Sequence, residues 1–477
     1  MTSNERSAAP RLPLVPWPRR VERASGELAL SGAVVATHGS LEPAAQALAR
    51  SLERLGVEAR ARAGAPGEGD VALALDAGLR GEACRFECGR AARISASSPR
   101  AVAQAAATLL QLAKRDDDGV ARVPRLTILD EPDCEYRGLL LDVARRPHSV
   151  RTIERMVELC RLYKLNFLQL HLTDDESFTF PSGAFPRLAA PGRGYTVGEL
   201  RHLESFSQAR GVTIVPEIEM PGHCGAAIAA MPELLRASEK HPATINFADP
   251  RVVAILETLI GEALAIFASS PWFHVGGDEC DLAFVHENPA FPRAFARERV
   301  DDAHGLHAWF LGRMNEVVRR HGRRTLVWEG FRHGVRPEVP RDVTVMVYET
   351  AHHRPDCLVR DGYAVINASW RPLYVVNGRC WPPEEIHAWD RFRWNHFVEG
   401  FPAFGGLRIE PASAAGRVAG AQLCAWEQPE SAELPSLRQR AAVFAERAWN
   451  PGAGGSFAEL AARVGACDAV LDRLTDR

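Results

Sequence analysis

The stretch Trp272-Phe-His-Val-Gly-Gly-Asp-Glu-Cys280 is an apolar segment that runs through a glycine pair and ends on two adjacent carboxylates. Its aromatic and β-branched residues favour an extended strand, so we expect Asp278 and Glu279 at the carboxyl end of that strand. Two acids in one recess cannot both ionise cheaply; one pKa should rise and the other stay low. Such a pair supplies a proton donor and a fixed anion at the same pH. The alternative is an exposed acidic turn, and the glycine pair and His274 argue against it.

Similar apolar segments recur along the chain from Tyr136 onward and alternate with helical patterns. We find eight strand candidates, the number that closes a barrel. The segments between most of them have the length that a strand–helix–strand crossover needs. The sequence therefore predicts an α/β fold, a (β/α)8 TIM barrel. The expected strands are 138–144, 166–172, 212–218, 272–275, 325–328, 343–348, 364–368 and 420–426, and the expected helices include 150–163, 197–210, 250–268 and 306–321.

A smaller domain precedes the barrel. Residues 1–12 are expected to form a disordered leader. Residues 13–131 contain strand patterns at 26–35 and 70–75 and helix patterns at 41–55 and 100–114, which suggest a small α/β sandwich. A hydrophilic turn at 114–119 and the segment Asp130-Glu-Pro-Asp133 mark the boundary. The barrel then takes residues 132–477, with a long insertion at about 370–406 after the seventh strand and a final helix at 457–474 on the outside.

Composition and charge limit the kinds of partner. The 477 residues carry 57 basic and 60 acidic side chains, well mixed, for a net charge of −3, so no electrostatic footprint for nucleic acid or an anionic membrane appears. The ten cysteines show neither paired zinc spacing nor a dense disulfide framework. The N-terminal residues lack an apolar run, and no apolar span approaches 20 residues. We expect a cytoplasmic protein that binds a neutral molecule, without nucleic acid or membrane partners; a homodimer stays open.

Polar residues gather where barrel chemistry takes place, at the carboxyl ends of the expected strands. Aromatic walls beside charged groups suit a sugar ring, because its C–H faces pack on indole while its hydroxyls bond arginine and carboxylates. A lone Trp328 or Trp426 would be a core residue and a lone His223 structural, but together with the acids they predict a carbohydrate pocket. His171 is expected to be structural or to support a neighbour. The strand-end residues are Asp142, Arg145, His171, Asp174, Asp175, Glu217, Glu219, His223, His274, Asp278, Glu279, Trp328, Glu329, Tyr348, Glu349, Trp426, Glu427 and Gln428.

Four motifs in order carry a resemblance to a known family. They are Arg137-Gly-Leu-Leu-Leu-Asp-Val-Ala-Arg145, Asn166-x4-His-Leu-Thr-Asp-Asp175, Pro216-Glu-Ile-Glu-Met-Pro-Gly-His223 and His274-Val-Gly-Gly-Asp-Glu279. Their order and spacing resemble the successive signatures of glycoside hydrolase family 20, the β-N-acetylhexosaminidases. Val15-Pro-Trp-Pro18 and Thr108-Leu-Leu-Gln-Leu112 resemble that family's small α/β domain, so the resemblance covers most of the chain.

The resemblance implies a mechanism in which the substrate's own acetamido group is the nucleophile. Glu279 would be the general acid and then the base that activates water. Asp278 would orient the acetamido nitrogen and stabilise the oxazolinium intermediate. The other implied contacts are Arg145 to ring hydroxyls, Asp174 and His223 in support of the acid, Trp328 and Trp426 around the sugar, and Tyr374 to the acetamido carbonyl, with Tyr348 and Gln428 in the substrate pocket and Glu219 and His274 in supporting positions.

Several positions depart from the family pattern. Glu219 stands where Asp is usual, and Tyr348 where Trp is common. Tyr374-Val-Val376 replaces Tyr-x-Asp or Tyr-x-Asn, and Trp426-Glu-Gln428 replaces Trp-x-Glu. Both missing acids would contact outer hydroxyls of the terminal sugar. Either Asn377 and Glu427 substitute for them through loops shifted by one residue, or the pocket accepts a different or modified hexosamine.

The sequence favours a retaining exo-β-N-acetylhexosaminidase that acts on terminal N-acetylglucosamine or N-acetylgalactosamine of a glycan or glycoconjugate, without a metal or organic cofactor. A relative with altered specificity is the alternative among enzymes. A catalytically weak carbohydrate-binding protein is an alternative of another class, against which the retention of Asp278 and Glu279 argues. A metal-dependent hydrolase built on His171, His223, His274 and Asp278 is disfavoured because no strand carries a His-x-His pair. Which hexosamine, linkage and aglycone are used stays open.

Overall fold

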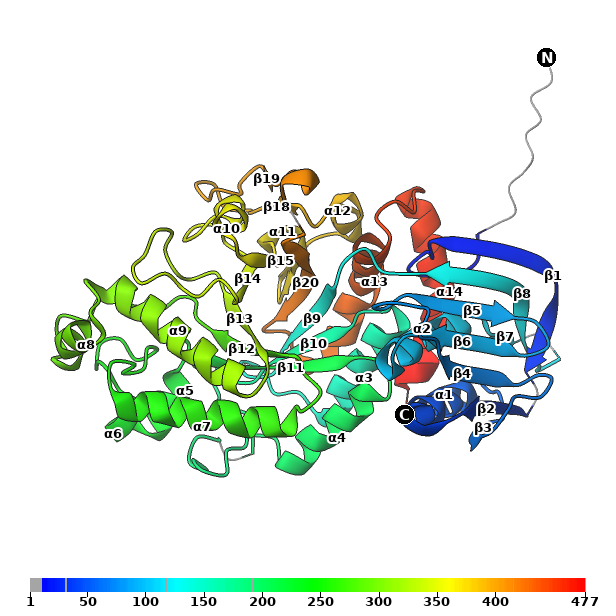
Figure 1. Cartoon of the computed structure of the whole chain (residues 1–477), viewed down its shortest axis with the longest axis horizontal. Coiled ribbons are helices and arrows are strands. Elements are labelled where there is room, and N and C mark those ends of the chain that lie inside the picture. Colours follow the sequence, from blue (N-terminus) through cyan, green and yellow to red (C-terminus); the bar gives the residue numbers. More distant parts are fainter. Residues whose placement is uncertain (1–10, 31, 116–117, 190–191, 415, 477) are drawn as a thin grey trace, which may run out of the picture.

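Eight parallel strands close into a barrel at the centre of the protein (Figure 1). The computed structural model describes residues 11–30, 32–115, 118–189, 192–414 and 416–476. All eight predicted barrel strands are present, and β20 pairs with β9 to complete the ring. In barrel order they are β9 (Tyr136–Asp142), β10 (Phe167–His171), β11 (Thr213–Met220), β12 (Trp272–Gly276), β13 (Arg324–Trp328), β14 (Thr344–Val347), β15 (Ala364–Asn367) and β20 (Val418–Trp426).

The barrel strands are buried on both faces. Every residue of β9, β10, β11 and β12 is buried. A parallel strand packs helices on one face and the barrel interior on the other, so its sequence is a continuous apolar run rather than an alternation. That property is why these strands stand out in the sequence.

Helices surround the barrel, and the four predicted ones are confirmed to within three residues at either end. They are α3 (Val150–Leu162), α4 (Val197–Gln208), α7 (Pro250–Ile266) and α9 (Ala303–Arg320), joined by α5 (Gly225–Ala230), α6 (Pro232–Leu235), α8 (Ala290–Glu298), α10 (Pro355–Asp361) and α13 (Glu430–Trp449). Side chains of Ser149, Thr196, Asp249 and Asp302 cap α3, α4, α7 and α9. Residues 329–343, all described, join β13 to β14 without a helix.

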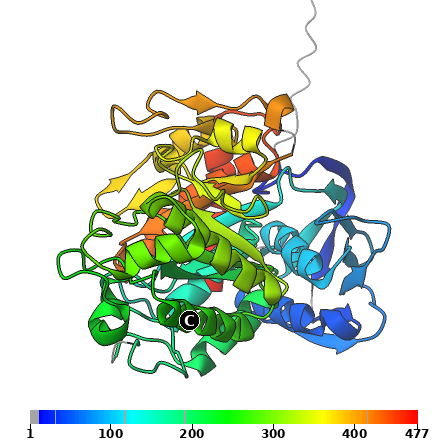
Figure 2. The ribbon, with the colours of Figure 1, turned by 60° about the vertical axis from the view of Figure 1, so that its left-hand side comes forward.

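The insertion after the seventh strand is not a plain loop. It contains α11 (Trp370–Leu373), β16 (Tyr374–Val376), β17 (Arg379–Cys380), α12 (Pro383–Ala388) and β18 (Arg393–Trp394), and β18 pairs with β19 (Leu407–Arg408) before a 3-10 turn at Pro411–Ala414. Strand β16 pairs with the end of β20, Tyr374 with Cys424 and Val376 with Trp426. The insertion thus adds a strand to the barrel edge; Figure 2 shows its yellow and orange segments gathered at the top of the molecule in that view.

The N-terminal domain is a single sheet with helices on one face. Its strand order is β1-β8-β5-β6-β4-β2-β3, with β7 beside β8. The strands are β1 (Arg20–Leu30), β2 (Ala33–Thr37), β3 (Ala59–Ala63), β4 (Val71–Leu75), β5 (Cys84–Cys88), β6 (Ala92–Ala96), β7 (Lys114–Arg115) and β8 (Ala121–Asp130), and the helices α1 (Glu42–Arg54) and α2 (Pro99–Leu112) follow a 3-10 turn at Gly39–Leu41.

This small domain meets the barrel at the amino-terminal ends of its strands. Arg137, at the start of β9, pairs with Glu82 at 2.7 Å, and Lys164, before β10, pairs with Asp130 at 2.8 Å. These contacts lie at the end of the strands opposite to the carboxyl rim. The small domain therefore packs against the end of the barrel opposite to the carboxyl rim and does not cover that rim.

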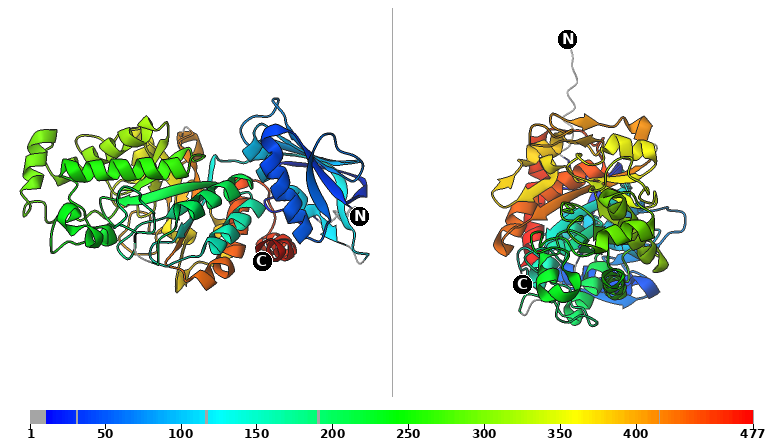
Figure 3. Two further views of the ribbon diagram at one scale, coloured as in Figure 1. Left: turned by 90° about the horizontal axis from the view of Figure 1, so that it is seen from below. Right: turned by 90° about the vertical axis from the view of Figure 1, so that its left-hand side faces the viewer.

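The final helix, α14 (Phe457–Thr475), packs outside the barrel as predicted, against α3 and also against α1 and α2. Figure 3 (left) shows it in dark red, in the angle between the barrel and the blue domain. The predicted leader falls mostly on residues 1–10, which lie outside the described part; Arg11 already bonds the carbonyls of Ala453 and Gly454. No helix among the described residues is long and apolar enough to cross a membrane.

Candidate active site

The glycine pair at the end of β12 turns the chain so that two carboxylates face the barrel rim. Gly276 and Gly277 have φ of 68° and 101°, in the left-handed region that favours glycine. A Cβ on Gly276 would lie 1.8 Å from Glu219 Oε2. Because Gly276 has no side chain, there is room for the Glu219 carboxylate beside β12. This space accommodates the methylene by which glutamate is longer than aspartate.

Asp278 is largely buried, and one of its oxygens is unsatisfied. Its side chain is 13% exposed, Oδ2 lies 4.0 Å from His223 Nε2, and Oδ1 has no hydrogen-bond partner. Burial and the charge of Glu279 raise the pKa of Asp278 to about 6, although the charge of His223 opposes this. A buried carboxylate oxygen without a partner costs free energy, which a ligand N–H at that point would recover.

Glu279 lies next to Asp278 and is the more exposed of the two acids. Its side chain is 53% exposed, Oε2 lies 3.4 Å from His223 Nε2, and Oε1 accepts a hydrogen bond from the Tyr348 hydroxyl at 3.5 Å. The hydrogen bond from His223 lowers the pKa of Glu279. The expected split of the two pKa values is present, but its direction is reversed for the implied roles: the raised pKa belongs to Asp278, because that carboxylate is the more deeply buried.

His223 joins the two acids to a second acidic group. Its Nδ1 lies 3.5 Å from Asp174 Oδ1 and 3.7 Å from Asp175 Oδ2, while Nε2 faces Asp278 and Glu279. The nearness of these four carboxylates raises the pKa of His223 well above its usual range despite its burial and favours the imidazolium form, although Nδ1 makes no hydrogen bond of good geometry. His223 and Glu279 are both non-glycine residues with positive φ, 49° and 42°. Such strain persists where the surrounding structure fixes a functional side chain.

Arg145 is held at the carboxyl rim of the barrel by carboxylates and an indole. Its guanidinium pairs with Asp174 Oδ2 at 2.8 Å and with Asp142 Oδ2 at 3.3 Å, and it lies 5.2 Å from the centre of the Trp426 ring. Asp142 also accepts the backbone N–H of Glu427 at 3.1 Å. The ends of β9, β10 and β20 are thereby fixed to one another around Arg145.

A buried chain of hydrogen bonds runs behind these residues. His171 lies between Asp174 Oδ2, 2.8 Å from Nε2, and Glu217 Oε2, 2.9 Å from Nδ1. The charges of Glu217 and bonds to both carboxylates raise the pKa of His171 to about 10 against the effect of burial, so both ring nitrogens donate. Glu217 Oε1 in turn accepts the Trp328 indole N–H at 2.6 Å. His171 and Glu217 therefore position Asp174 and Trp328.

Glu219 and His274 lie next to this chain of hydrogen bonds. Burial and the charges of Asp278 and Glu217 raise the pKa of Glu219 well above its usual range, so Glu219 is neutral. His274 Nδ1 accepts the Gly276 N–H at 3.0 Å, and burial lowers the pKa of His274 to about 4. His274 is thus a neutral ring that shapes the glycine turn.

Aromatic side chains pack against one another beside the acid pair and form an aromatic wall. Trp328 lies 5.7 Å from Tyr348 and 5.9 Å from Trp426, and Tyr374 lies 6.3 Å from Tyr348 and 6.1 Å from Trp426 between ring centres. Tyr374 reaches this wall because β16 pairs with β20. Trp370, which sequence reasoning missed, packs against Tyr374 with ring centres 4.3 Å apart and planes tilted by 32°. Its place in the insertion gave no signal, since three other insertion tryptophans were equally prominent.

The two departures from the family pattern lie side by side. Val376 is half-buried against the aromatic wall, and Gln428 is buried with its Nε2 donating to Val375 O at 3.0 Å. Asn377 is exposed in the turn between β16 and β17, and Glu427 is exposed with φ of 57°. The amide nitrogen of Gln428 is therefore bonded within the protein, and its role toward a substrate stays a prediction.

Glu329 and Glu349 are two further acids at the rim. Glu329 accepts backbone N–H groups of Thr350, His352 and His353 at 2.6, 2.8 and 3.1 Å, so it anchors the loop after β14. Burial and the charges of Glu279 and Asp278 raise the pKa of Glu349 to about 7.

Three groups of side chains at the rim have the composition of metal sites: His171 with Glu217 and Glu219, His223 with Asp174 and Asp175, and His223 with Asp278 and Glu279. In each group the histidine nitrogens lie within 4.0 Å of carboxylate oxygens, so ion pairs between the side chains already hold these groups together.

The chain matches two models of a known protein family and is similar to several known proteins. Residues 134–452 match the family model described as "Glycosyl hydrolase family 20, catalytic domain", and residues 11–131 match "Glycosyl hydrolase family 20, domain 2". A beta-hexosaminidase of Vibrio furnissii is 30% identical over 408 residues, which are 78% of this chain and 66% of that protein. The mouse beta-hexosaminidase subunit beta is 25% identical over 368 residues, 72% of this chain and 64% of that one. The chain thus spans less than two thirds of these relatives' length.

Solved structures are similar over almost the whole chain. The crystal structure of a GH20 exo beta-N-acetylglucosaminidase from Vibrio harveyi, in complex with N-acetylglucosamine, has a TM-score of 0.81 at 25% identity and covers 99% of this chain and 80% of that chain. The beta-N-acetylhexosaminidase of Bacteroides fragilis has a TM-score of 0.79 at 22% identity, covering 97% and 96%.

Proposed function

The chain belongs to glycosyl hydrolase family 20, and from that membership we propose that it is a retaining exo-β-N-acetylhexosaminidase. Its substrate is a glycan or glycoconjugate with a terminal β-linked N-acetylglucosamine or N-acetylgalactosamine. The observation that carries the proposal is the unsatisfied, buried Asp278 Oδ1 beside the half-exposed Glu279. This pair offers an acceptor for an acetamido N–H next to a group that can exchange a proton with solvent.

The first step is an attack by the substrate on itself. The acetamido carbonyl oxygen bonds to the anomeric carbon while the glycosidic C–O bond breaks, and Glu279 gives its proton to the leaving oxygen. Asp278 accepts the acetamido N–H and, as an anion, stabilises the positive charge of the oxazolinium ring. The Tyr374 hydroxyl donates to the attacking carbonyl oxygen, and Trp328 and Trp426 enclose the sugar.

Water opens the oxazolinium ring in the second step. Glu279, now a carboxylate, removes a proton from water as its oxygen attacks the anomeric carbon. The acetamido group returns to the sugar, and the configuration is retained because both displacements invert the same carbon. Arg145 holds ring hydroxyls throughout, since Asp142 and Asp174 fix its guanidinium.

Substrate binding must reverse the protonation of the two acids. In the free protein Asp278 has the raised pKa and Glu279 the lowered one. A sugar that donates its N–H to Asp278 favours the anion there, and the same sugar buries Glu279 and separates it from water, which favours the neutral acid. Occupancy of the pocket thus moves the proton of the pair to Glu279.

Hydrolysis of a panel of aryl β-glycosides tests this function. We expect cleavage of the N-acetylglucosaminide and N-acetylgalactosaminide, no comparable cleavage of the plain β-glucoside, and loss of activity in Glu279→Gln. Equal rates on the glucoside would sink the substrate-assisted mechanism. A carbohydrate-binding protein without activity would bind N-acetylglucosamine in this pocket yet cleave none of the panel.

Altered specificity is a second candidate within the same family, and Val376 and Gln428 favour it. An apolar side chain and a neutral amide that is already bonded stand where acids are usual, so the outer hydroxyls of the sugar meet no negative charge there. We expect aryl N-acetylhexosaminides substituted at an outer hydroxyl to be cleaved at least as well as the unsubstituted sugar. A strict preference for the unsubstituted sugar contradicts this candidate.

A cytoplasmic location and a homodimeric state stay predictions, to be checked by cell fractionation and by sedimentation of the purified protein. The absence of a cofactor requirement is also a prediction, and activity after exhaustive dialysis against a chelator checks it.

A further inference from the structure

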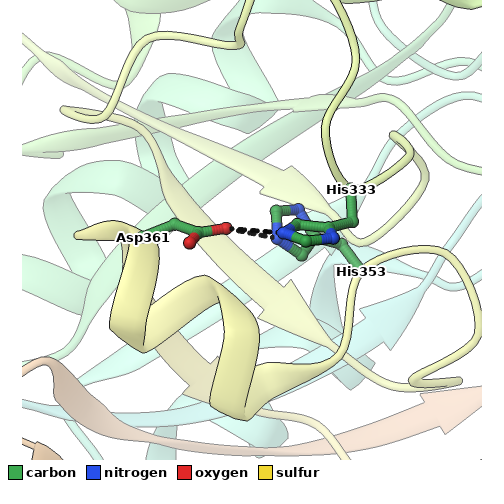
Figure 4. A group of neighbouring side chains, drawn as sticks. All are labelled: His333, His353 and Asp361. Atoms are coloured by element: carbon green, nitrogen blue, oxygen red, sulfur yellow. Dashed lines mark hydrogen bonds and ion pairs between the residues drawn. The ribbon is translucent and has the colours of Figure 1, made fainter.

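Two histidines and an aspartate from three different segments meet in a cluster that shares no residue with the catalytic pair (Figure 4). His333 lies in the loop after β13, His353 in the loop after β14, and Asp361 is the last residue of α10. Nε2 of His333 lies 3.3 Å from Asp361 Oδ2, and Nε2 of His353 lies 3.1 Å from the same oxygen. Three possible ligand atoms thus converge on one point.

Hydrogen bonding alone gives an incomplete account of this arrangement. The His353 contact, at 3.1 Å, is an ordinary hydrogen bond, whereas the His333 contact, at 3.3 Å, exceeds the usual N–H···O range of about 2.7–3.2 Å. Both imidazoles also face one oxygen and leave the other carboxylate oxygen aside. Around a tetrahedral zinc ion with bonds of about 2.0–2.1 Å, neighbouring ligand atoms lie about 3.3–3.4 Å apart. The observed spacing is close to that edge length.

The imidazole of His353 is fixed in place by its surroundings. The side chain is 4% exposed, and its ring makes edge contacts with Phe331 and Tyr363 at 5.4 and 5.9 Å between centres. Its Nδ1 is buried without a polar partner, which leaves Nε2 as the nitrogen that can bind a ligand. Glu329 holds the backbone N–H of the same residue at 3.1 Å. A preorganised ligand loses little conformational entropy on binding.

The opposite side of the cluster is open. His333 is 56% exposed and Asp361 27% exposed, and all three residues line a small cavity of about 110 Å³ with Glu338 and Arg341 at its edge. An ion could enter from solvent, and water could occupy a fourth coordination position. Imidazole nitrogens favour zinc over calcium or magnesium, which prefer oxygen ligands.

We propose that His333, His353 and Asp361 bind one zinc ion, with water as the fourth ligand. The ion ties the loop after β13 to the loop after β14 and to α10. The second of these loops begins with Tyr348, which follows β14 directly and whose hydroxyl contacts Glu279, so the ion stiffens the barrel rim without contacting the reacting atoms. This role is structural and does not depend on the proposed glycosidase activity.

Metal content after equilibrium dialysis tests the site. The full-length protein is stripped with chelator, dialysed against about 10 µM Zn²⁺, and measured by atomic spectroscopy. We expect about one equivalent in the unaltered protein and at least tenfold weaker binding in His333→Ala and in Asp361→Asn. His202→Ala is the matched control, because His202 is 54% exposed and pairs with a single acid, Glu154, at 2.8 Å; it should keep the equivalent.

Two further readouts separate this site from adventitious binding. Co²⁺ in place of Zn²⁺ should give the intense visible absorption of a tetrahedral site in the unaltered protein and the control but not in His333→Ala. Zn²⁺ should raise Tm by several degrees in the same two proteins only. Circular dichroism establishes that the exposed-site variant His333→Ala is folded. No stoichiometric metal in the unaltered protein, or a full equivalent retained by folded His333→Ala, overturns the proposal.

Discussion

The pH dependence of kcat/KM follows from the coupled pair Asp278 and Glu279. The reaction needs one proton on the pair, because the acid must donate it while the other carboxylate stays an anion. Below the lowered pKa of Glu279 both groups are protonated, and above the raised pKa of Asp278, about 6, both are ionised. The two values belong to the pair as a whole. We therefore expect a bell-shaped profile with its maximum below pH 6.

The alkaline limb has a calculable size. Above pH 6 the singly protonated pair declines tenfold per pH unit, so kcat/KM should be about a tenth of its maximum at pH 7 and about a hundredth at pH 8. The assay uses an aryl N-acetyl-β-glucosaminide at low substrate concentration, with samples stopped in alkali so that ionisation of the released phenol does not vary. Unfolding is excluded by return of each sample to pH 5 before a second assay.

A dinitrophenyl glycoside is the matched control substrate. Its leaving group departs without a proton, so the alkaline limb should disappear while the acid limb, which reports the anion at Asp278, persists. The reasoning is refuted if kcat/KM of the ordinary aryl substrate is flat from pH 5 to 8, or if both substrates share the same alkaline limb.

Three other changes test the roles of single residues. Asp278→Asn should lower kcat by about 10²–10³ with KM changed only a few-fold, because the lost charge is needed in the transition state; unchanged kcat removes Asp278 from the mechanism. His171→Gln should cost about 3–5 kcal/mol in urea unfolding, because two buried carboxylates lose their cation. The ion pairs of His171 with these carboxylates also make the free energy of unfolding depend on pH. Since folding raises the pKa of His171 from 6.5 to about 10, their stabilisation is complete below pH 6.5 and is lost as pH rises through 10. Equal free energies of unfolding at pH 7 and pH 10 would contradict this. Gly276→Ala should cost about 2–5 kcal/mol, because the new Cβ meets Glu219 in a left-handed backbone, whereas Gly465→Ala in α14, with open space around its Cβ, should not destabilise.

The barrel could be predicted because its strands carry their own signal. Strands buried on both faces are short apolar runs, and helices of 12 to 18 residues such as α4 and α9 separate several of them. The position of the strand-end residues could also be predicted, since a residue just after a strand in a parallel barrel must lie on the carboxyl rim. Asp278, Glu279, Arg145 and His223 follow from that rule together with the family motifs.

The insertion was harder to predict because its position depends on pairing over a distance. Tyr374 joins the aromatic wall only because three residues of β16 add to the end of β20. Trp370 packs against Tyr374 for the same reason, whereas the indole N–H groups of Trp389 and Trp394 donate to backbone carbonyls. A tryptophan in a loop has no periodicity, so its sequence position does not distinguish these outcomes.

The sequence by itself determined the barrel, the order of its strands and the acid pair, because each depends on residues adjacent in the chain. Only the tertiary structure decided which acid holds the proton in the free protein, since pKa values depend on burial and on charges brought by other strands. It also decided that Glu219 fits in the space left by Gly276. It likewise brought His333 and His353 to the same oxygen of Asp361, although these residues are up to 28 positions apart in the sequence. Contacts of this kind are set by how loops and strands meet, and no local pattern encodes them.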